Sequence, residues 1–213
     1  MQKGNNESKS VSTYRESLRE RILETAMRAF TSRGIKAVKM DDIAHELSIS
    51  KRTLYELYEN KELLLFAGIR QYKARKEREL HELLAQSRNV IDLILLSYHK
   101  KVEESSRIAP AFYSDIERYP TVVSYLEKDR EENHRRFSYF IKRGISEGFF
   151  RRDIDIELLT SAFEAVILNY MSSQIYKEHS VEDITKNIIF ITIRGICTQK
   201  GIEALDNFFA TLV

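Results

Sequence analysis

The residues best suited to chemistry lie close together in the first third of the chain. Arginine and lysine donate hydrogen bonds to guanine or phosphate, hydroxyl side chains donate to phosphate oxygens, and glutamate accepts from cytosine. Side chains of all these kinds occur between residues 50 and 61. This composition favours contact with a nucleic acid over catalysis. The candidate contact residues are Ser50, Lys51, Arg52, Thr53, Tyr55, Glu56 and Lys61.

A short helix and a tight turn precede these residues. The helix is predicted over residues 41–47, because three apolar side chains fall on one face at about 100° per residue. They are Ile43, Ala44 and Leu47. Asp41 and Asp42 suit the positive end of a helix. A turn of three residues follows, in which Ile49 can fill the angle between this helix and the next.

A second short helix is predicted over residues 51–58. Ser50 is its candidate N-cap, because a serine hydroxyl accepts a hydrogen bond from a first-turn N–H. Its apolar stripe consists of Leu54, Leu57 and Tyr58, and Arg52, Tyr55 and Glu56 face the other way. A helix-turn-helix needs this arrangement, since the N-terminal residues of its second helix reach base edges in the major groove. Periodicity alone fits an ordinary surface hairpin with a solvated charged face equally well.

The motif itself distinguishes these two readings. It resembles the DNA-binding signature of the TetR family of bacterial transcriptional regulators. The resemblance implies that Lys51, Arg52 and Thr53 enter the major groove, with Arg52 the best candidate for a guanine, and that Tyr55 and Lys61 hold phosphates. The matching residues are Ile43-Ala44, Ser50-Lys51-Arg52-Thr53-Leu54-Tyr55, Tyr58 and Asn60-Lys61-Glu62-Leu63-Leu64.

Four positions leave questions open. Glu56 can accept from cytosine N4 or pair with Arg52 four residues before it. Ser48 stands where many members of the family have glycine, which leaves open whether this residue is left-handed. Lys39 stands in place of a threonine or serine cap and its phosphate contact, and Tyr58 replaces the usual phenylalanine.

Composition favours an all-α fold. The chain has 213 residues but only 7 glycines and 2 prolines, and apolar residues recur at spacings of three and four. A net charge of +2 requires that any DNA contact come from a local patch. The single cysteine, Cys197, excludes an intrachain disulfide and is expected to be an inert buried thiol. No apolar run approaches the roughly 20 residues that span a bilayer. We therefore expect a cytoplasmic protein without membrane contact.

The predicted domains follow the helices and their breaks. An N-terminal three-helix helix-turn-helix domain begins with a helix from Tyr14 to Ser32, which Gly34 ends. A C-terminal helical domain binds the ligand and forms the dimer. The divisions are 1–13, a flexible arm; 14–60, the DNA-binding domain; 61–88, a connecting helix; and 89–213, the effector-binding and dimerisation domain.

Two C-terminal helices, predicted over 155–177 and 181–198, are apolar on more than one stripe. Each can therefore face both its own core and a partner. The resemblance implies that they pair across a two-fold axis as a four-helix bundle; the alternative is a buried hairpin in a monomer. A homodimer would present two recognition helices about 34–36 Å apart. The expected partner is double-stranded DNA with a palindromic, inverted-repeat operator.

An unusual number of aromatic rings occurs in the C-terminal domain. They are expected to line a pocket for a small apolar or aromatic effector, whose identity the sequence does not give. The alternative for any one ring is a plain core residue. The candidate pocket residues are Tyr98, Phe112, Tyr113, Tyr125, Phe137, Phe140, Phe163 and Tyr170.

Two other functions were weighed. A helical enzyme is disfavoured because the five histidines are scattered, with no H-E-x-x-H or paired Glu-x-x-His arrangement, no phosphate-binding glycine loop and no G-x-S-x-G. No metal site, catalytic residue or cofactor is therefore expected. A helical protein-interaction module without DNA binding is the stronger alternative, because the net charge is weak. The favoured interpretation is a ligand-responsive repressor.

Overall fold

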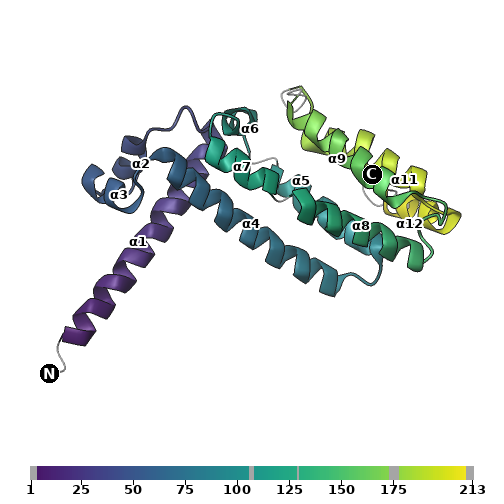
Figure 1. Ribbon diagram of the computed structural model, residues 1–213, viewed down its shortest axis with the longest axis horizontal. Helices are drawn as coiled ribbons and strands as arrows, with labels where there is room; N and C mark the ends of the chain where they lie inside the picture. The colour runs from purple at the N-terminus through teal and green to yellow at the C-terminus, as the bar shows by residue number, and fades with distance from the viewer. Residues whose placement is uncertain (1–3, 106–107, 129, 173–177, 210–213) are drawn as a thin grey trace. The chain divides into compact units, whose positions relative to one another are not determined.

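The computed structural model describes residues 4–105, 108–128, 130–172 and 178–209, and these residues form helices (Figure 1). The described side chains exclude those of 4–12, 102, 105, 167–172, 181 and 208–209. The helices are α1 (Gly4–Arg33), α2 (Met40–Glu46), α3 (Lys51–Leu57), α4 (Lys61–Gln86), α5 (Val90–Ser105), α6 (Pro110–Ile116), α7 (Pro120–Lys128), α8 (Arg130–Ser146), α9 (Ile156–Ser172), α10 (Val181–Ile184), a π-helical turn (Thr185–Ile189), α11 (Phe190–Ile196) and α12 (Gln199–Phe209). The all-α prediction is confirmed: the described residues contain an isolated bridge between Phe150 and Cys197 but no strand.

The chain divides into two compact units, each built from two segments. The head unit consists of residues 1–75 and 109–124, and the body unit consists of residues 76–108 and 125–213. Helix α4 begins in the head unit and ends in the body unit. Helix α6 and the start of α7, which the sequence placed in the effector domain, lie in the head unit with the helix-turn-helix.

The core of the head unit is formed by the apolar faces of α1, α2, α3 and α4. Each apolar side chain removed from water contributes roughly 25 cal/mol per Å² of buried area, so these faces hold the short helices α2 and α3 in place. The fully or nearly fully buried side chains are Leu18, Ile22, Ala26 and Phe30 of α1, Ile43 and Ala44 of α2, Leu54 of α3, and Leu64 and Leu65 of α4.

Helix α1 begins at Gly4 rather than at Tyr14, because no proline or glycine interrupts residues 5–33. It ends where Gly34 adopts a positive φ of 85° and donates its N–H to the carbonyl of Phe30 at 2.9 Å. The left-handed conformation suits glycine, which has no Cβ. The predicted C-terminal role of Gly34 is therefore confirmed.

Helix α6 packs closely against the end of α1. The N–H of Ala109 donates to the carbonyl of Thr31, and the buried carboxylate of Asp115 accepts from the N–H of Lys36, each at 2.7 Å. A Cβ at Gly34 would lie 2.8 Å from the Cβ of Ala111. Gly34 thus allows both the turn and the close approach of α6.

The turn between α2 and α3 is a Schellman motif. Ser48 donates its N–H to the carbonyl of His45, and Ile49 donates to that of Ala44, each at 3.0 Å. This pattern requires a left-handed residue after the C-cap, and Ser48 has a φ of 54°. The left-handed conformation is therefore kept at Ser48, although glycine is absent. The half-buried Ile49 follows directly, at the point where the chain enters α3.

Helix α3 begins with the predicted cap. The Oγ of Ser50 accepts from the N–H of Thr53 at 3.0 Å, which satisfies one of the donors left unpaired at a helix N-terminus. The hydroxyl of Tyr58, the residue that replaces phenylalanine, donates to the carbonyl of Arg19 at 3.5 Å. The start of the recognition helix is therefore held by a local hydrogen bond, and the residue after its end is bonded to α1.

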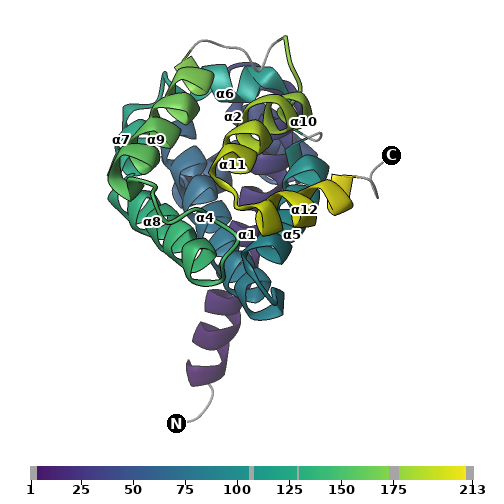
Figure 2. The ribbon, with the colours of Figure 1, turned by 90° about the vertical axis from the view of Figure 1, so that its right-hand side faces the viewer.

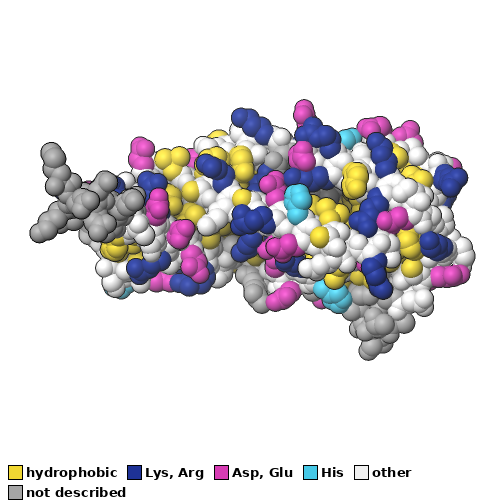
Figure 3. All heavy atoms as spheres, turned by 90° about the horizontal axis from the view of Figure 1, so that it is seen from below, with side chains coloured by type: hydrophobic (Ala, Val, Ile, Leu, Met, Phe, Trp, Pro, Cys, Tyr) yellow, Lys and Arg dark blue, Asp and Glu magenta, His cyan; other side chains and the backbone are white. Residues whose placement is uncertain are grey.

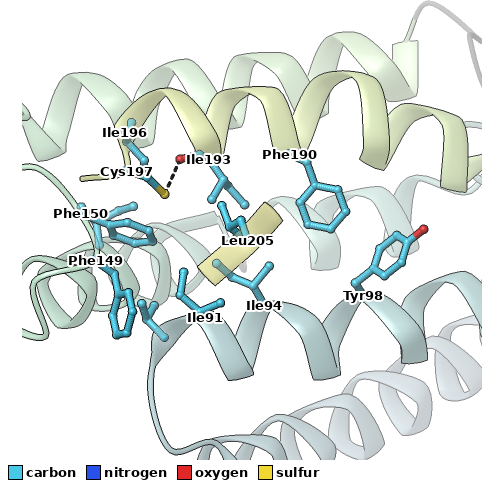
Figure 4. Close-up of a cluster of buried hydrophobic side chains, with 12 residues drawn as sticks. Ile91, Ile94, Tyr98, Phe149, Phe150, Phe190, Ile193, Ile196, Cys197 and Leu205 are labelled. Atoms are coloured by element: carbon cyan, nitrogen blue, oxygen red, sulfur yellow. Dashed lines mark hydrogen bonds between the residues drawn. The ribbon is translucent and has the colours of Figure 1, made fainter. Parts of the chain in front are cut away.

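The body unit has its own hydrophobic core, formed by α5, α8, α11, α12 and the segment after α8 (Figures 2 and 4). The predicted helix 121–147 is covered by α7 and α8, between which residue 129 lies outside the described residues, and the predicted helix 181–198 is α10, the π-helical turn and α11. The core side chains include Ile91 and Ile94 of α5, Ile141 of α8, Phe149 and Phe150, Phe190 and Ile193 of α11, and Leu205 of α12.

The turn geometry predicts opposite effects for two serines. Ser48→Gly should stabilise the head unit by about 0.5–1 kcal/mol, because it removes the Cβ strain of a left-handed residue. Ser50→Ala should destabilise it by about 1 kcal/mol, because it removes the N-cap. Urea unfolding followed by circular dichroism measures both changes. An unchanged or lower midpoint for Ser48→Gly would contradict the assigned strain.

Candidate DNA-binding surface and effector cavity

Helix α3 presents the candidate contact residues to solvent. Leu54 has no exposed surface and Leu57 is 8% exposed, so these two leucines fix which side of the helix faces inward. The residues Lys51, Arg52, Tyr55 and Glu56 are exposed, and the side chain of Arg52 retains 88% of its surface. The N-terminal half of α3 is therefore an open surface of hydrogen-bonding groups.

Two exposed ion pairs cross this surface. The Nε of Arg52 donates to Oε1 of Glu56 at 2.8 Å, and the Nζ of Lys51 donates to Oδ2 of Asp41. Of the two roles open to Glu56, pairing with Arg52 is therefore the one observed in the protein without DNA. Exposed pairs are weak in water, and each leaves further donors on its cation free to face a nucleic acid. Thr53 is half-buried, and its hydroxyl lies 2.8 Å from that of Ser50.

Lys61, at the start of α4, lies in a different setting. Its Nζ donates to the carbonyls of Ile35 and Val38, each at 3.0 Å, in the segment between α1 and α2. Burial lowers the pKa of the Lys61 ammonium, while Asp115 and Asp42 act to raise it. This lysine therefore ties α4 to the α1–α2 connection. Its predicted phosphate contact must come from the ammonium's remaining donor.

Charges of both signs are interspersed over the face of the molecule drawn in Figure 3. This distribution agrees with a net charge of only +2. Attraction to a polyanion must therefore come from local groups such as those on α3.

The body unit contains a cavity of about 630 Å³, a size that accommodates a drug-sized ligand. Four of the predicted rings line it: Tyr98, Phe137, Phe140 and Phe163. The ring centroids of Phe137 and Phe163 are 4.6 Å apart, and those of Tyr98 and Phe190 are 5.0 Å apart. Figure 4 shows Tyr98 on α5 facing Phe190 on α11.

The other predicted rings lie elsewhere. Phe112 and Tyr113 belong to α6, where Phe112 is buried in the head unit. Tyr125 is not among the described residues that line the cavity. Tyr170 belongs to α9, but its side chain lies outside the described residues. Helical periodicity cannot distinguish the rings that line the cavity from the others, because an aromatic residue on an apolar face is also a normal core residue.

Sequence reasoning missed the polar part of the cavity. Lys101 of α5 and three arginines of α8 line it beside the rings. On a sequence these residues look like the solvated faces of charged helices. Only the packing of α5 against α8 shows that they border a hollow. The arginines are Arg135, Arg136 and Arg143.

The helices predicted to form the dimer carry exposed apolar residues. Leu158 and Val166 of α9 are 69% and 37% exposed, and Ile191 of α11 is 64% exposed. Helices α9 and α11 lie side by side in both ribbon views (Figures 1 and 2). This surface, the α9–α11 face, is open in the single chain.

The described residues give little support to thiol reactivity or metal binding. Cys197 is buried, its Sγ lies 3.2 Å from the carbonyl of Ile193, and burial raises the pKa of its thiol to about 11. A thiol of this kind is not reactive near neutral pH. The described residues include no group of three or more His, Cys, Asp or Glu that could hold a metal. None of the described helices is long and apolar enough to cross a membrane.

Comparison with known proteins agrees with this geometry. Residues 22–67 match the model of the tetR family of bacterial regulatory proteins, and this segment contains the C-terminal part of α1, all of α2 and α3, and the start of α4. The chain is 24% identical over 148 residues to the HTH-type transcriptional repressor KstR2 of Mycobacterium tuberculosis, covering 67% of this chain and 74% of the repressor. It is 22% identical over 194 residues to KstR2 of Mycolicibacterium smegmatis, covering 87% and 93%.

A solved structure extends the likeness beyond the helix-turn-helix. A TetR-family transcriptional regulator from Agrobacterium tumefaciens superposes with a TM-score of 0.69 at 16% identity, over 86% of this chain and 100% of the other. The fold, the exposed recognition helix and the matched segment define a helix-turn-helix regulator. Residues 22–67 carry the DNA-binding domain of the TetR family, and the chain is similar to DNA-binding transcriptional regulators of that family.

Proposed function

We propose that the chain is a repressor that binds an inverted-repeat operator as a homodimer and responds to a small apolar or aromatic effector. The observation that carries this proposal is the orientation of α3: Leu54 is fully buried, and Arg52 is almost fully exposed. A helix held in this way can insert its N-terminal residues into the major groove. As a regulator of transcription it would act in the bacterial cytoplasm, and we propose no enzymatic activity for it.

The proposed contact residues divide into two kinds. Lys51, Arg52 and Thr53 would enter the groove, where the guanidinium of Arg52 can bind guanine O6 and N7 together. Tyr55 of α3 and Lys61 of α4 would hold phosphates, which orient the protein without reading sequence. Ser50 caps α3. Glu56 orients Arg52 through their ion pair.

A homodimer is supported by the α9–α11 face. Large apolar side chains exposed together on a soluble chain mark an interaction surface more often than isolated ones do. Pairing through α9 and α11 would cover Leu158 and Ile191, which water otherwise surrounds. Two-fold symmetry then gives the operator its inverted repeat.

An effector is supported by the cavity in the body unit. Its aromatic and aliphatic lining suits an apolar ligand, and its volume lies in the range of known ligand sites. One solved relative, from Saccharomonospora viridis, was determined in complex with choline; it is 20% identical, with a TM-score of 0.67, over 86% of this chain and 100% of the other. Leu80 and Leu84 of α4 line the cavity, and the same helix begins at Lys61 in the head unit. The ligand would act by binding one conformer of the chain more tightly than another.

The alternative is a helical interaction module without DNA binding. The mixed surface charge favours it, because no broad basic face is present on the side shown in Figure 3. The exposed hydrogen-bonding groups at the start of α3 favour DNA. A gel shift with the DNA upstream of its own gene distinguishes the two functions.

Arg52→Ala should reduce discrimination at one base pair by about 1–3 kcal/mol, or about 5- to 150-fold, because it removes a bidentate base contact. Binding to duplexes selected from a random library, with that base pair varied, measures the change. Glu56→Gln is the matched control, since it removes the ion pair but keeps Arg52. If Glu56→Gln reproduced the loss at the same base pair, Arg52 would act through the pair and not through the base.

Lys61→Ala should weaken binding to every duplex alike and reduce the slope of log K against log salt by about one, because one phosphate contact is lost. Affinity is measured over a series of salt concentrations. Since Lys61 also holds two carbonyls, the variant's unfolding midpoint is measured beside it. A lower midpoint with unchanged affinity and slope would leave Lys61 with a structural role alone.

Ile191→Glu should convert the dimer to a monomer at micromolar concentration, because it places a charge in an apolar interface. Light scattering coupled to gel filtration should give twice the 25.0 kDa chain mass for the native chain and 25.0 kDa for the variant. Leu126→Glu is the matched control, because Leu126 of α7 is also exposed but lies outside the α9–α11 face. Two variants with the same mass would exclude this surface.

A further inference from the structure

One lysine that lines the cavity of the body unit has no ion-pair partner among the residues that the structure describes. Lys101 belongs to α5, and it lines the cavity together with Tyr98 of the same helix and three arginines of α8. In the described part of the chain the structure records no hydrogen bond or ion pair for its ammonium. All three lining arginines, in contrast, have carboxylate partners.

The pairs of the arginines account for every other charge on the cavity wall. Arg135 lies 2.6 Å from Glu132, Arg136 lies 3.0 Å from Glu77, and Arg143 lies 2.7 Å from Glu147. Each lining arginine therefore has at least one carboxylate partner, and Glu132 contacts both Arg135 and Arg136. Among the charged residues described on the cavity wall, Lys101 has no recorded ion pair. Each named partner lies in the body unit.

The surroundings of Lys101 distinguish it from a solvated surface lysine. Its side chain keeps a large accessible area, yet the ammonium lies deep enough among protein atoms that burial lowers its pKa. The two observations agree if the accessible area faces the hollow and not bulk water. No carboxylate contributes to that shift. An amine in such a place is poorly solvated and unpaired, which is unfavourable.

Much of the remaining cavity lining is apolar. The cavity is bordered by Leu80, Ile94, Phe137, Phe140, Phe163 and Ile193. The π-helical turn places both Thr185 and Ile189 on the same wall, and such turns recur at functional sites. A ligand that fills this space must bury an apolar body and place one polar group near Lys101.

We propose that the effector is an amphipathic carboxylate, whose apolar or aromatic body fills the cavity and whose carboxylate pairs with the ammonium of Lys101. The inference rests on the proposed ligand response and specifies its chemistry. A carboxylate supplies the missing counter-charge and forms a charge-assisted hydrogen bond. An alcohol of the same length fills the same space without that bond, and a cation of the same length is repelled.

The test measures binding to the full-length chain without DNA. The probes are dodecanoate, dodecan-1-ol and dodecyltrimethylammonium, which share one apolar chain. Each is titrated by isothermal calorimetry, the two ions below their micelle concentrations and the alcohol below its solubility limit. The native chain should bind dodecanoate about tenfold or more tightly than dodecan-1-ol, and the cation most weakly. Lys101→Met should lose this preference but still bind the alcohol, and Lys101→Arg should retain it.

The neighbouring lysine provides the matched control. The ammonium of Lys100 lies 3.3 Å from Glu79, and Lys100 is not among the residues that line the cavity, so Lys100→Met should bind all three probes as the native chain does. Equal affinity for acid and alcohol, no binding of dodecanoate, or a preference that survives Lys101→Met would overturn the inference. Lys101-dependent binding that left the DNA affinity unchanged would support the inference and count against the proposed ligand response.

Discussion

Burial of Leu54 is the constraint on which the DNA-binding surface depends. Helix α3 has seven residues and is too short to be stable alone. Its orientation is therefore set by the core of the head unit, through Leu54 and Leu57, and by the Ser50 cap at its start. Because these contacts fix one face inward, the opposite face carries Arg52 and its neighbours outward. The contacts that α3 can make with DNA thus depend on the packing of Leu54 and Leu57, which are buried and do not face the DNA.

The local geometry of the helix-turn-helix could be predicted from the sequence, because its signals are local. The apolar spacing of Ile43, Ala44 and Leu47 and the hydroxyl at Ser50 each act within one or two turns of helix. The conformation of Ser48 could not be predicted in the same way. A serine reads as an ordinary turn residue, and only the Schellman bonds of His45 and Ala44 require it to be left-handed. The burial of the apolar faces of α2 and α3 compensates for the strain of the left-handed Ser48.

The features that the sequence did not predict, the place of α6 and the polar lining of the cavity, depend on long-range contacts. Helix α6 is separated from α1 by many residues, and its place in the head unit depends on the bond between Asp115 and Lys36 and on the small surface of Gly34. Only four of the eight predicted aromatic rings line the cavity. The sequence could not select them, because an aromatic ring packs in a core as readily as in a cavity wall. Lys101 gave no signal, because a lysine on a helix is normally solvated. Its significance arises from the folded unit, in whose described residues it lines the cavity without a carboxylate that acts on its pKa.

The two ends of α4 connect these observations. At its start, Lys61 holds two carbonyls of the α1–α2 connection; further along, Leu80 and Leu84 border the cavity. A continuous α-helix is a stiff element, because its backbone hydrogen bonds are all internal. A ligand that neutralises the charge of Lys101 and contacts Leu80 and Leu84 would favour the position of α4 that gives it the more favourable contacts. By reciprocity, DNA that favours another position would weaken the ligand. The same coupling free energy would then act on both binding equilibria.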